Sequence, residues 1–85
     1  MTLAGFQVRV LLFGYYRELA GTSELQFDLP AGSRVEDLVT AIRSDPLFWG
    51  LPSTPAVAVN RRYAPGSQVL LSEDEIALIP PMSGG

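Results

Sequence analysis

Residues 80–85, PPMSGG, have the composition of a reactive chain end rather than of a folded core. Gly84 and Gly85 carry no side chain, so they can enter a channel that is too narrow for other residues. Pro80 and Pro81 favour an extended, polyproline-like course and cannot continue a central strand. At about 3.1 Å per residue, the six residues would reach roughly 19 Å. We therefore expect an extended tail that presents the Gly85 carboxylate; the alternative is a frayed terminus without a function.

The rest of the chain lacks the side chains on which most catalysis depends. Its 85 residues include no Cys, which excludes disulfides, thiolate metal sites and Cys-based sulfur or acyl chemistry. The chain also contains no His, which removes the usual neutral-pH proton shuttle and the commonest metal ligand. All six basic residues are Arg, so no lysine can form a Schiff base. We expect no metal site, no bound cofactor and no catalysis by this chain alone.

Size and charge narrow the class of protein further. A chain of 85 residues forms one small domain. The net charge of −3 argues against nucleic-acid binding, which rests on basic contacts, and favours a partner with a basic face. The apolar runs are too short to span a bilayer, and no charged leader precedes a signal-type segment. We expect a cytoplasmic protein with no membrane partner.

The first third of the sequence predicts two strands, and their spacing favours an antiparallel pair. Apolar side chains alternate over residues 6–13 and again over residues 24–29. Between these segments, residues 15–20 can form a turn or two of helix. The first segment is also apolar on its second face at Leu11 and Phe13. That pattern predicts either a covered central strand or a docking surface.

The clearest helix signal follows at residues 33–45. Ser33 and Glu36 have the spacing of a capping box, and Asp37 adds negative charge near the helix N-terminus. Apolar residues recur at positions i, i+3, i+4 and i+7, namely Val35, Leu38, Val39 and Ile42. Burying this stripe would contribute roughly 6–12 kcal/mol as an upper bound, against about 1 kcal/mol for the cap, so packing decides this helix. Pro46 prevents its regular continuation.

Short β-forming segments separated by turns occupy the second half. Asn60-Arg61 suits a tight hairpin turn. Residues 47–51 predict a helical turn that closes the edge of the core, with a ligand pocket as the alternative. The extended segments that we expect in this half are residues 56–59, 62–63, 68–71 and 75–79.

The resulting order, β-β-α-β-β-β, predicts an α+β domain over residues 1–79, followed by the tail at 80–85. One amphipathic helix covering one face of a mixed sheet is the β-grasp, or ubiquitin-like, arrangement. In that arrangement the first and last strands pair in parallel at the sheet centre, connected through the helix. Leu11 or Phe13 would then lie beside Ile79 on the face away from the helix, close to the tail.

Three segments of the chain resemble the small, sulfur-carrying subunit of molybdopterin synthase, one of the MoaD/ThiS-type ubiquitin-like sulfur carriers. They are VRVLLFGYYRELAGT (residues 8–22), VAVN (residues 57–60) and DEIALIPPMSGG (residues 74–85). The RELAG segment after an F-G step and the PPMSGG ending are the most specific parts. The departures are modest and spare the terminal glycines: Met82 stands where the family usually has Val, and Glu73 where a turn Gly is common.

This resemblance implies a chemistry centred on Gly84-Gly85. An E1-like activating enzyme would use ATP and magnesium to adenylate the Gly85 carboxylate, which a sulfur donor would then convert into a thiocarboxylate. The large synthase subunit would accept the tail and transfer its sulfur to cyclic pyranopterin monophosphate, forming the molybdopterin dithiolene. Two carriers would deliver the two sulfurs in turn, as part of a heterotetramer. The chain itself would be a non-catalytic subunit of this sulfurtransferase.

The same resemblance implies a surface that contacts the large subunit. Ordering a free tail costs on the order of 1–2 kcal/mol per residue, so the folded domain must contribute to docking. The alternative for these side chains is a purely structural role. The positions that match the family's partner-binding surface are Phe13, Arg17, Tyr63, Ile79, Pro80, Pro81, Met82 and Ser83.

Three other functions fit parts of the pattern. A sulfur carrier of thiamine thiazole synthesis shares the fold and the terminal glycines, but the RELAG segment and the PPMSGG ending fit it less well. A ubiquitin-like protein modifier would instead form an isopeptide bond with a lysine of its target. A plain β-grasp binding module would not use its terminus. The resemblance favours the molybdopterin subunit first, the thiamine carrier second and the modifier third.

Overall fold

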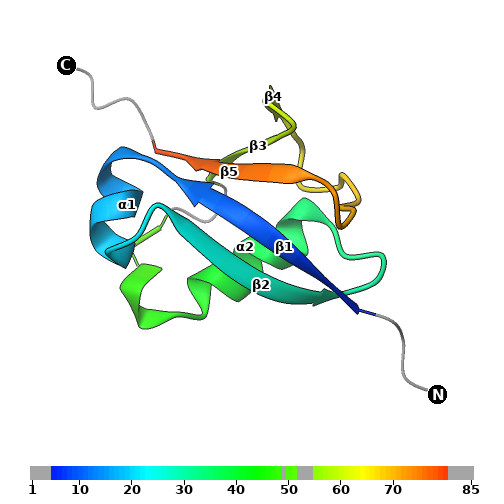
Figure 1. Cartoon of the computed structure of the whole chain (residues 1–85), viewed down its shortest axis with the longest axis horizontal. Helices are drawn as coiled ribbons and strands as arrows, with labels where there is room; N and C mark the ends of the chain where they lie inside the picture. Colours follow the sequence, from blue (N-terminus) through cyan, green and yellow to red (C-terminus); the bar gives the residue numbers. More distant parts are fainter. Residues whose placement is uncertain (1–4, 49, 52–54, 81–85) are drawn as a thin grey trace.

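A computed structural model describes residues 5–48, 50–51 and 55–80 of the chain. Figure 1 shows these residues as one twisted sheet with the longer helix lying across one of its faces. The elements are, in chain order, β1 (Gly5–Leu12), α1 (Gly14–Ala20), β2 (Glu24–Pro30), α2 (Val35–Arg43), the 3₁₀ helix η1 (Pro46–Phe48), β3 (Ala56–Val59), β4 (Arg62–Tyr63) and β5 (Glu75–Ile79).

The sheet confirms the predicted β-grasp topology. Its strand order is β2-β1-β5-β3-β4. β1 pairs in parallel with β5, from Arg9 opposite Glu75 to Leu12 opposite Leu78. All other neighbouring pairs are antiparallel. Because parallel neighbours need a long crossover, the chain must pass over the sheet through α2 between β1 and β5, and α2 thereby covers one face.

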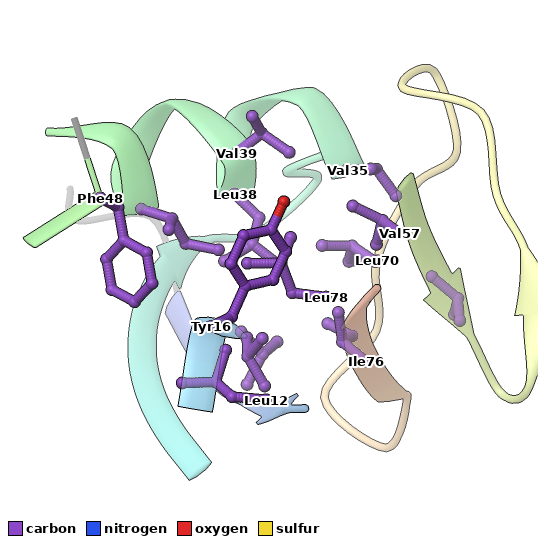
Figure 2. Close-up of a cluster of buried hydrophobic side chains, with 14 of the residues drawn as sticks. Leu12, Tyr16, Val35, Leu38, Val39, Phe48, Val57, Leu70, Ile76 and Leu78 are labelled. Carbon is purple, nitrogen blue, oxygen red and sulfur yellow. The ribbon is translucent and has the colours of Figure 1, made fainter. Parts of the chain in front are cut away.

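The core lies between α2 and the covered face of the sheet (Figure 2). The predicted helix stripe is fully inside, and the inward residues of the central strands meet it there. Residues of the edge strand β2 are covered less completely, because only one neighbouring strand flanks them. The buried residues of α2, β1 and β5 are Val35, Leu38, Val39, Ile42, Val8, Val10, Leu12, Ile76 and Leu78.

Two short helices close the end of the core near the last residues of β5. α1 ends at Gly21, which adopts φ +72° and donates its N–H to the Arg17 carbonyl at 3.0 Å. Tyr16 of α1 is buried, and its ring stands among the core side chains with the hydroxyl directed towards α2 (Figure 2). Phe48 of η1 is only 1% exposed, so the predicted helical turn does close the core. Trp49, which the prediction also included, lies outside the described residues.

The predicted capping box of Ser33 and Glu36 is wrong. The N-cap of α2 is Arg34, whose N–H donates to Asp37 Oδ2 at 2.8 Å. Ser33 Oγ instead donates to the Pro30 carbonyl at 2.7 Å and so stabilises the preceding turn. The register of the cap is therefore one residue later than the sequence spacing indicates.

A neighbouring loop explains this shift. The first free N–H groups of α2, those of Val35 and Glu36, donate to the carbonyls of Gln68 and Gly66 at 2.9 and 3.0 Å. Backbone acceptors thus satisfy the donors that a Ser33 side chain would have capped. The same loop contains the segment 68–71, predicted to be a weak strand or an extended piece; it forms a single bridge, Val69 with Arg34, and no regular strand of the sheet.

No helix among the residues described for this chain is both long and apolar enough to cross a membrane.

The corrected cap can be tested by comparing two neighbouring carboxylates. We expect Asp37→Ala to lower the free energy of unfolding by about 1 kcal/mol, because it removes the acceptor for the Arg34 N–H. Glu36→Ala should change it by less than about 0.5 kcal/mol, because that exposed side chain caps nothing. Urea unfolding of both variants measures the difference. A larger decrease in the free energy of unfolding for Glu36→Ala than for Asp37→Ala would instead support the capping box of Ser33 and Glu36 that the sequence spacing predicts.

Candidate functional site

The end of β5 lies beside the start of α1. Parallel pairing brings the last residues of β1 and β5 to the same edge of the sheet, with Leu12 opposite Leu78. Directly after these strands, the chain continues into Phe13 and Pro80. A Cβ atom built on Gly14 would lie 3.5 Å from Pro80 Cγ, so the backbone of the F-G step runs within van der Waals reach of Pro80. Figure 1 shows this corner, with the end of β5 next to α1. The tail therefore begins at the corner where β1 passes into α1.

A shallow apolar hollow lies on the sheet face that α2 leaves open, next to this corner. Strand pairing aligns Leu11, Ala77 and Ala58 in one row across β1, β5 and β3, and Tyr63 of β4 follows opposite Ala58. The two alanines are small and leave room between the larger side chains on either side. The hollow measures about 520 Å³ and is lined by Leu11, Phe13, Ala58, Arg61, Tyr63, Glu75, Ala77 and Ile79.

Three of the sequence-predicted docking residues line this hollow. Phe13 is 46% exposed and Tyr63 is 76% exposed, whereas Ile79 is partly buried between them. None of the three belongs to the buried cluster beneath α2. A purely structural role in that cluster is therefore excluded for Phe13 and Tyr63, and the three side chains form one apolar surface.

Of the other predicted site residues, the structure describes only Arg17 and Pro80, and neither lines the hollow. Arg17 is exposed on α1 but does not line the hollow. Pro80 is partly buried beside Gly14. Pro81, Met82, Ser83, Gly84 and Gly85 lie outside the described residues.

Sequence reasoning missed the alanine floor and the polar rim of the hollow. Ala58 and Ala77 attract no attention as single residues, and only the pairing of β3 with β5 shows that they lie opposite each other. On the rim, Arg61 Nε lies 3.8 Å from Glu75 Oε1. The signal that could have found the floor is the alternation of Ala with larger residues in AVAV and EIALI.

The described residues offer little chemistry of their own. Nowhere in residues 5–48, 50–51 and 55–80 do three His, Cys, Asp or Glu side chains gather as a metal site would require. Burial raises the pKa of the Tyr16 hydroxyl above its ordinary value, and the neighbouring Tyr15 adds to that shift. The Tyr16 phenol is therefore protonated at neutral pH and supplies no base. What the described residues do provide is an exposed apolar surface beside the start of the tail.

A second hollow lies at the opposite end of the sheet. It measures about 570 Å³ and is bounded by the end of β2, the following turn and the outer side of α2. Pro30 at its edge pairs with Gly5, the first residue of β1. Phe13 and Pro80 instead follow the last residues of β1 and β5, at the other end of β1. This hollow is thus far along the sheet from Pro80, and we assign the candidate site to the hollow beside Phe13 and Ile79.

Comparison with known proteins identifies the family of this chain. A sequence profile described as the ThiS family matches residues 10–85, which include both the hollow and the whole tail. The chain belongs to the ThiS family. This ThiS-family chain is 38% identical over 82 residues to the molybdopterin synthase sulfur carrier subunit of Chlamydomonas reinhardtii, a match that covers 93% of this chain and 99% of that protein.

Two further comparisons extend the result. The ThiS-family chain is 35% identical over 80 residues to the molybdopterin synthase sulfur carrier subunit of Arabidopsis thaliana, covering 93% of this chain and 83% of that protein. Its fold also matches the crystal structure of SAMP1 from Haloferax volcanii with a TM-score of 0.80 and 26% identity, over 93% of this chain and 99% of that chain. The family resemblance predicted from the sequence is confirmed.

The surface role of Tyr63 predicts a small effect on folding. Because its ring is mostly exposed, Tyr63→Ser should lower the free energy of unfolding by less than about 1 kcal/mol. Leu78→Ala, in the sheet but directed into the core, should cost about 2–5 kcal/mol. Urea titrations of the two variants make the comparison. Equal losses would assign Tyr63 to the folding core instead of to a binding surface.

Proposed function

We propose that this chain is the sulfur-carrier subunit of a molybdopterin synthase, and that its Gly85 carboxylate carries the sulfur. The observation that supports the proposal most strongly is the position of Pro80. The residue that begins the PPMSGG tail lies beside an exposed apolar hollow on a domain without catalytic side chains. The names of the relatives from Chlamydomonas reinhardtii and Arabidopsis thaliana agree with this function.

The carrier reaction needs two steps at the Gly85 carboxyl group, and other proteins supply the catalysis for both. A terminal α-carboxyl group ordinarily has a pKa of about 3.3–3.7, so it is ionised at neutral pH and is a poor electrophile. In the first step, a carboxylate oxygen attacks the α-phosphorus of magnesium-bound ATP on an E1-like activating enzyme, and pyrophosphate leaves. In the second step, hydrosulfide-level sulfur from a separate donor attacks the carbonyl carbon of the acyl adenylate, the carbon–oxygen bond to AMP breaks and AMP leaves, which yields the thiocarboxylate.

Sulfur transfer then requires the large synthase subunit. We propose that this subunit accepts residues 80–85 and transfers the sulfur to cyclic pyranopterin monophosphate, supplying the acid, base and oxyanion stabilisation that the carrier lacks. Two carriers and two large subunits would form the heterotetramer in which both dithiolene sulfurs are delivered. A cytoplasmic location is part of the same proposal.

The hollow contributes to docking because threading the tail alone is costly. Fixing six extended residues costs on the order of 6–12 kcal/mol in backbone conformational entropy. Covering one large apolar side chain recovers about 1.5–3 kcal/mol. Phe13, Tyr63 and Ile79 together can thus offset a large part of the ordering cost, provided that one partner covers the hollow and holds the tail at the same time.

A ubiquitin-like modifier is the second candidate, and the match to SAMP1, whose name stands for small archaeal modifier protein 1, favours it specifically. A modifier would use the same acyl adenylate, but would end as an amide of a target lysine rather than as a thiocarboxylate. A carrier for thiamine thiazole synthesis would form the same thiocarboxylate and differ in the acceptor of the sulfur. The product formed at Gly85 therefore separates carriers from modifiers, and the acceptor separates the two carriers.

Intact-mass measurement tests the carrier function directly. After incubation with an activating enzyme, MgATP and a sulfur donor, we expect the mass gain of one oxygen-to-sulfur exchange at the terminus. A variant that lacks Gly85 should gain no mass, yet its melting temperature should match that of the wild-type chain, because the tail adds little to the core.

Two results would contradict the proposal. One is a chain that joins other proteins covalently without forming a thiocarboxylate, which is the behaviour of a modifier. The other is a Gly85 deletion that unfolds the domain, which would make the terminus a structural element. Thiocarboxylate formation, followed by dithiolene synthesis only when the large subunit of molybdopterin synthase is present, supports the full proposal.

The assigned docking surface makes a separate prediction for Phe13→Ala. Loss of a covered phenyl ring worth about 1.5–3 kcal/mol should weaken binding to the large subunit by about tenfold to a hundredfold. The rate of adenylation should change much less. Leu47→Ala, which removes a similarly exposed apolar side chain outside the hollow, is the matched control and should alter neither measurement. Equal effects of Phe13→Ala on binding and on adenylation would remove the hollow from the docking surface.

A further inference from the structure

The β3–β4 turn is held by a side-chain network that the proposed chemistry does not use. Asn60 and Arg61 form this two-residue turn with φ values of +53° and +70°, which is the type I′ geometry that favours Asn at its first position. The turn carries Arg61, which lines the hollow, and leads into β4, whose second residue is Tyr63, the most exposed apolar side chain of the hollow.

Asn60 extends the pairing of β3 with β5 by one step beyond the regular ladder. The last regular pair is Val59 opposite Ile76. One residue further, the Asn60 N–H donates to the Glu75 carbonyl at 2.7 Å, and the Glu75 N–H donates to Asn60 Oδ1 at 2.9 Å. In an antiparallel ladder, a residue's own carbonyl would accept that second bond. Because Asn60 has turned into the left-handed region, its side-chain carbonyl takes that place.

Asp74 completes the network from the opposite side. Asn60 Nδ2 donates to Asp74 Oδ1 at 2.9 Å, and the Leu71 N–H donates to Asp74 Oδ2 at 2.8 Å. The two carboxylate oxygens thus connect the β3–β4 turn to the turn that precedes β5. We call the Asn60–Asp74 pair, with its bonds to Leu71 and Glu75, the turn clamp.

The position of β4 depends on few other contacts. β4 consists of two residues at the edge of the sheet and pairs only with β3. The Tyr63 ring is 76% exposed, so packing of that side chain does little to hold the strand. The ion pair of Arg61 with Glu75 is between exposed groups and contributes little. Beyond the backbone ladders through β3, the turn clamp is therefore the main side-chain connection between this wall of the hollow and β5.

We propose that Asn60 and Asp74 are positioning residues for docking, which hold the Arg61–Tyr63 wall of the hollow at a fixed distance from β5 and hence from the start of the tail. The inference rests on the proposed function for the identity of the partner, the large synthase subunit. It adds two residues that do not line the hollow, yet set the shape of the surface that the partner covers.

An exchange of the two side chains tests this inference while conserving net charge and size. Asn60→Asp alone places two carboxylates against each other. Asp74→Asn alone replaces one of the two acceptor oxygens by an NH2 group, so the Asn60 amide and the Leu71 N–H no longer have an acceptor oxygen each. In the double variant Asn60→Asp/Asp74→Asn, the carboxylate at position 60 accepts from the Glu75 N–H and from the amide at position 74. That amide's oxygen accepts from the Leu71 N–H, so every hydrogen bond of the clamp is restored.

Binding to the large subunit and amide hydrogen exchange are measured on the same four proteins. We expect each single variant to raise the Kd by about tenfold and the exchange rate of the Ala64 N–H by about tenfold, and the double variant to return both towards wild type. The Ala64 N–H donates to the Val57 carbonyl and reports the pairing of β4 directly. Val39→Ala, a destabilising change in α2 on the opposite face, controls for lost stability and should leave the Kd unchanged.

Four outcomes would count against the inference. Single variants that bind as tightly as wild type, or a double variant that binds no better than the single ones, overturn the positioning role. A Val39→Ala variant that weakens binding as much as Asn60→Asp reduces the clamp to a contribution to stability. Failure of the wild-type chain itself to bind the large subunit overturns the proposed function, and the docking role of the clamp with it, whereas the Ala64 exchange rates still show whether the clamp holds β4.

Discussion

The parallel pairing of β1 with β5 is the contact on which the arrangement of this molecule depends. It requires the crossover through α2, which buries one face of the sheet and leaves the other open. It also brings both strands to an end at the same edge, so Phe13 and Pro80 emerge side by side. The apolar hollow and the first residue of the tail are neighbours for this topological reason, although more than sixty residues of sequence separate Phe13 from Pro80.

The sheet face that α2 leaves open is polar at one end of the strands and apolar at the other. Towards the start of β1 it presents Gln7, Arg9, Gln26 and Glu75 around a polar hollow. Towards the end of β1 it becomes apolar and floored by alanines. The chain contains no Cys, His or Lys, and under the proposed function its contribution is to be recognised and to deliver the terminus. The apolar hollow and the first residue of the tail lie at one corner, where a single partner can contact both.

Strong periodicity made most of this fold predictable from the sequence. The stripe on α2 and the alternation in β1 and β5 determine which faces are buried, and the β-grasp topology follows from their order. The cap of α2 was misplaced by one residue because backbone carbonyls of a distant loop satisfy Val35 and Glu36. The alternation of Ala with larger residues in β3 and β5 marks both alanines of the floor, but only the register between the two strands shows that they lie opposite each other. The turn clamp could not be predicted, because it depends on the same register. Residues close in the sequence do not reveal which distant residue each of these side chains will meet.

The most direct test of the central claim is a crystal structure of the chain bound to the large subunit of molybdopterin synthase. The account predicts that one large subunit covers the floor of Ala58 and Ala77 with an apolar side chain, and that the same subunit encloses Gly85. A hollow that stays open to solvent while the terminus is held elsewhere would contradict it. So would a complex in which one subunit covers the hollow and a different one receives the tail.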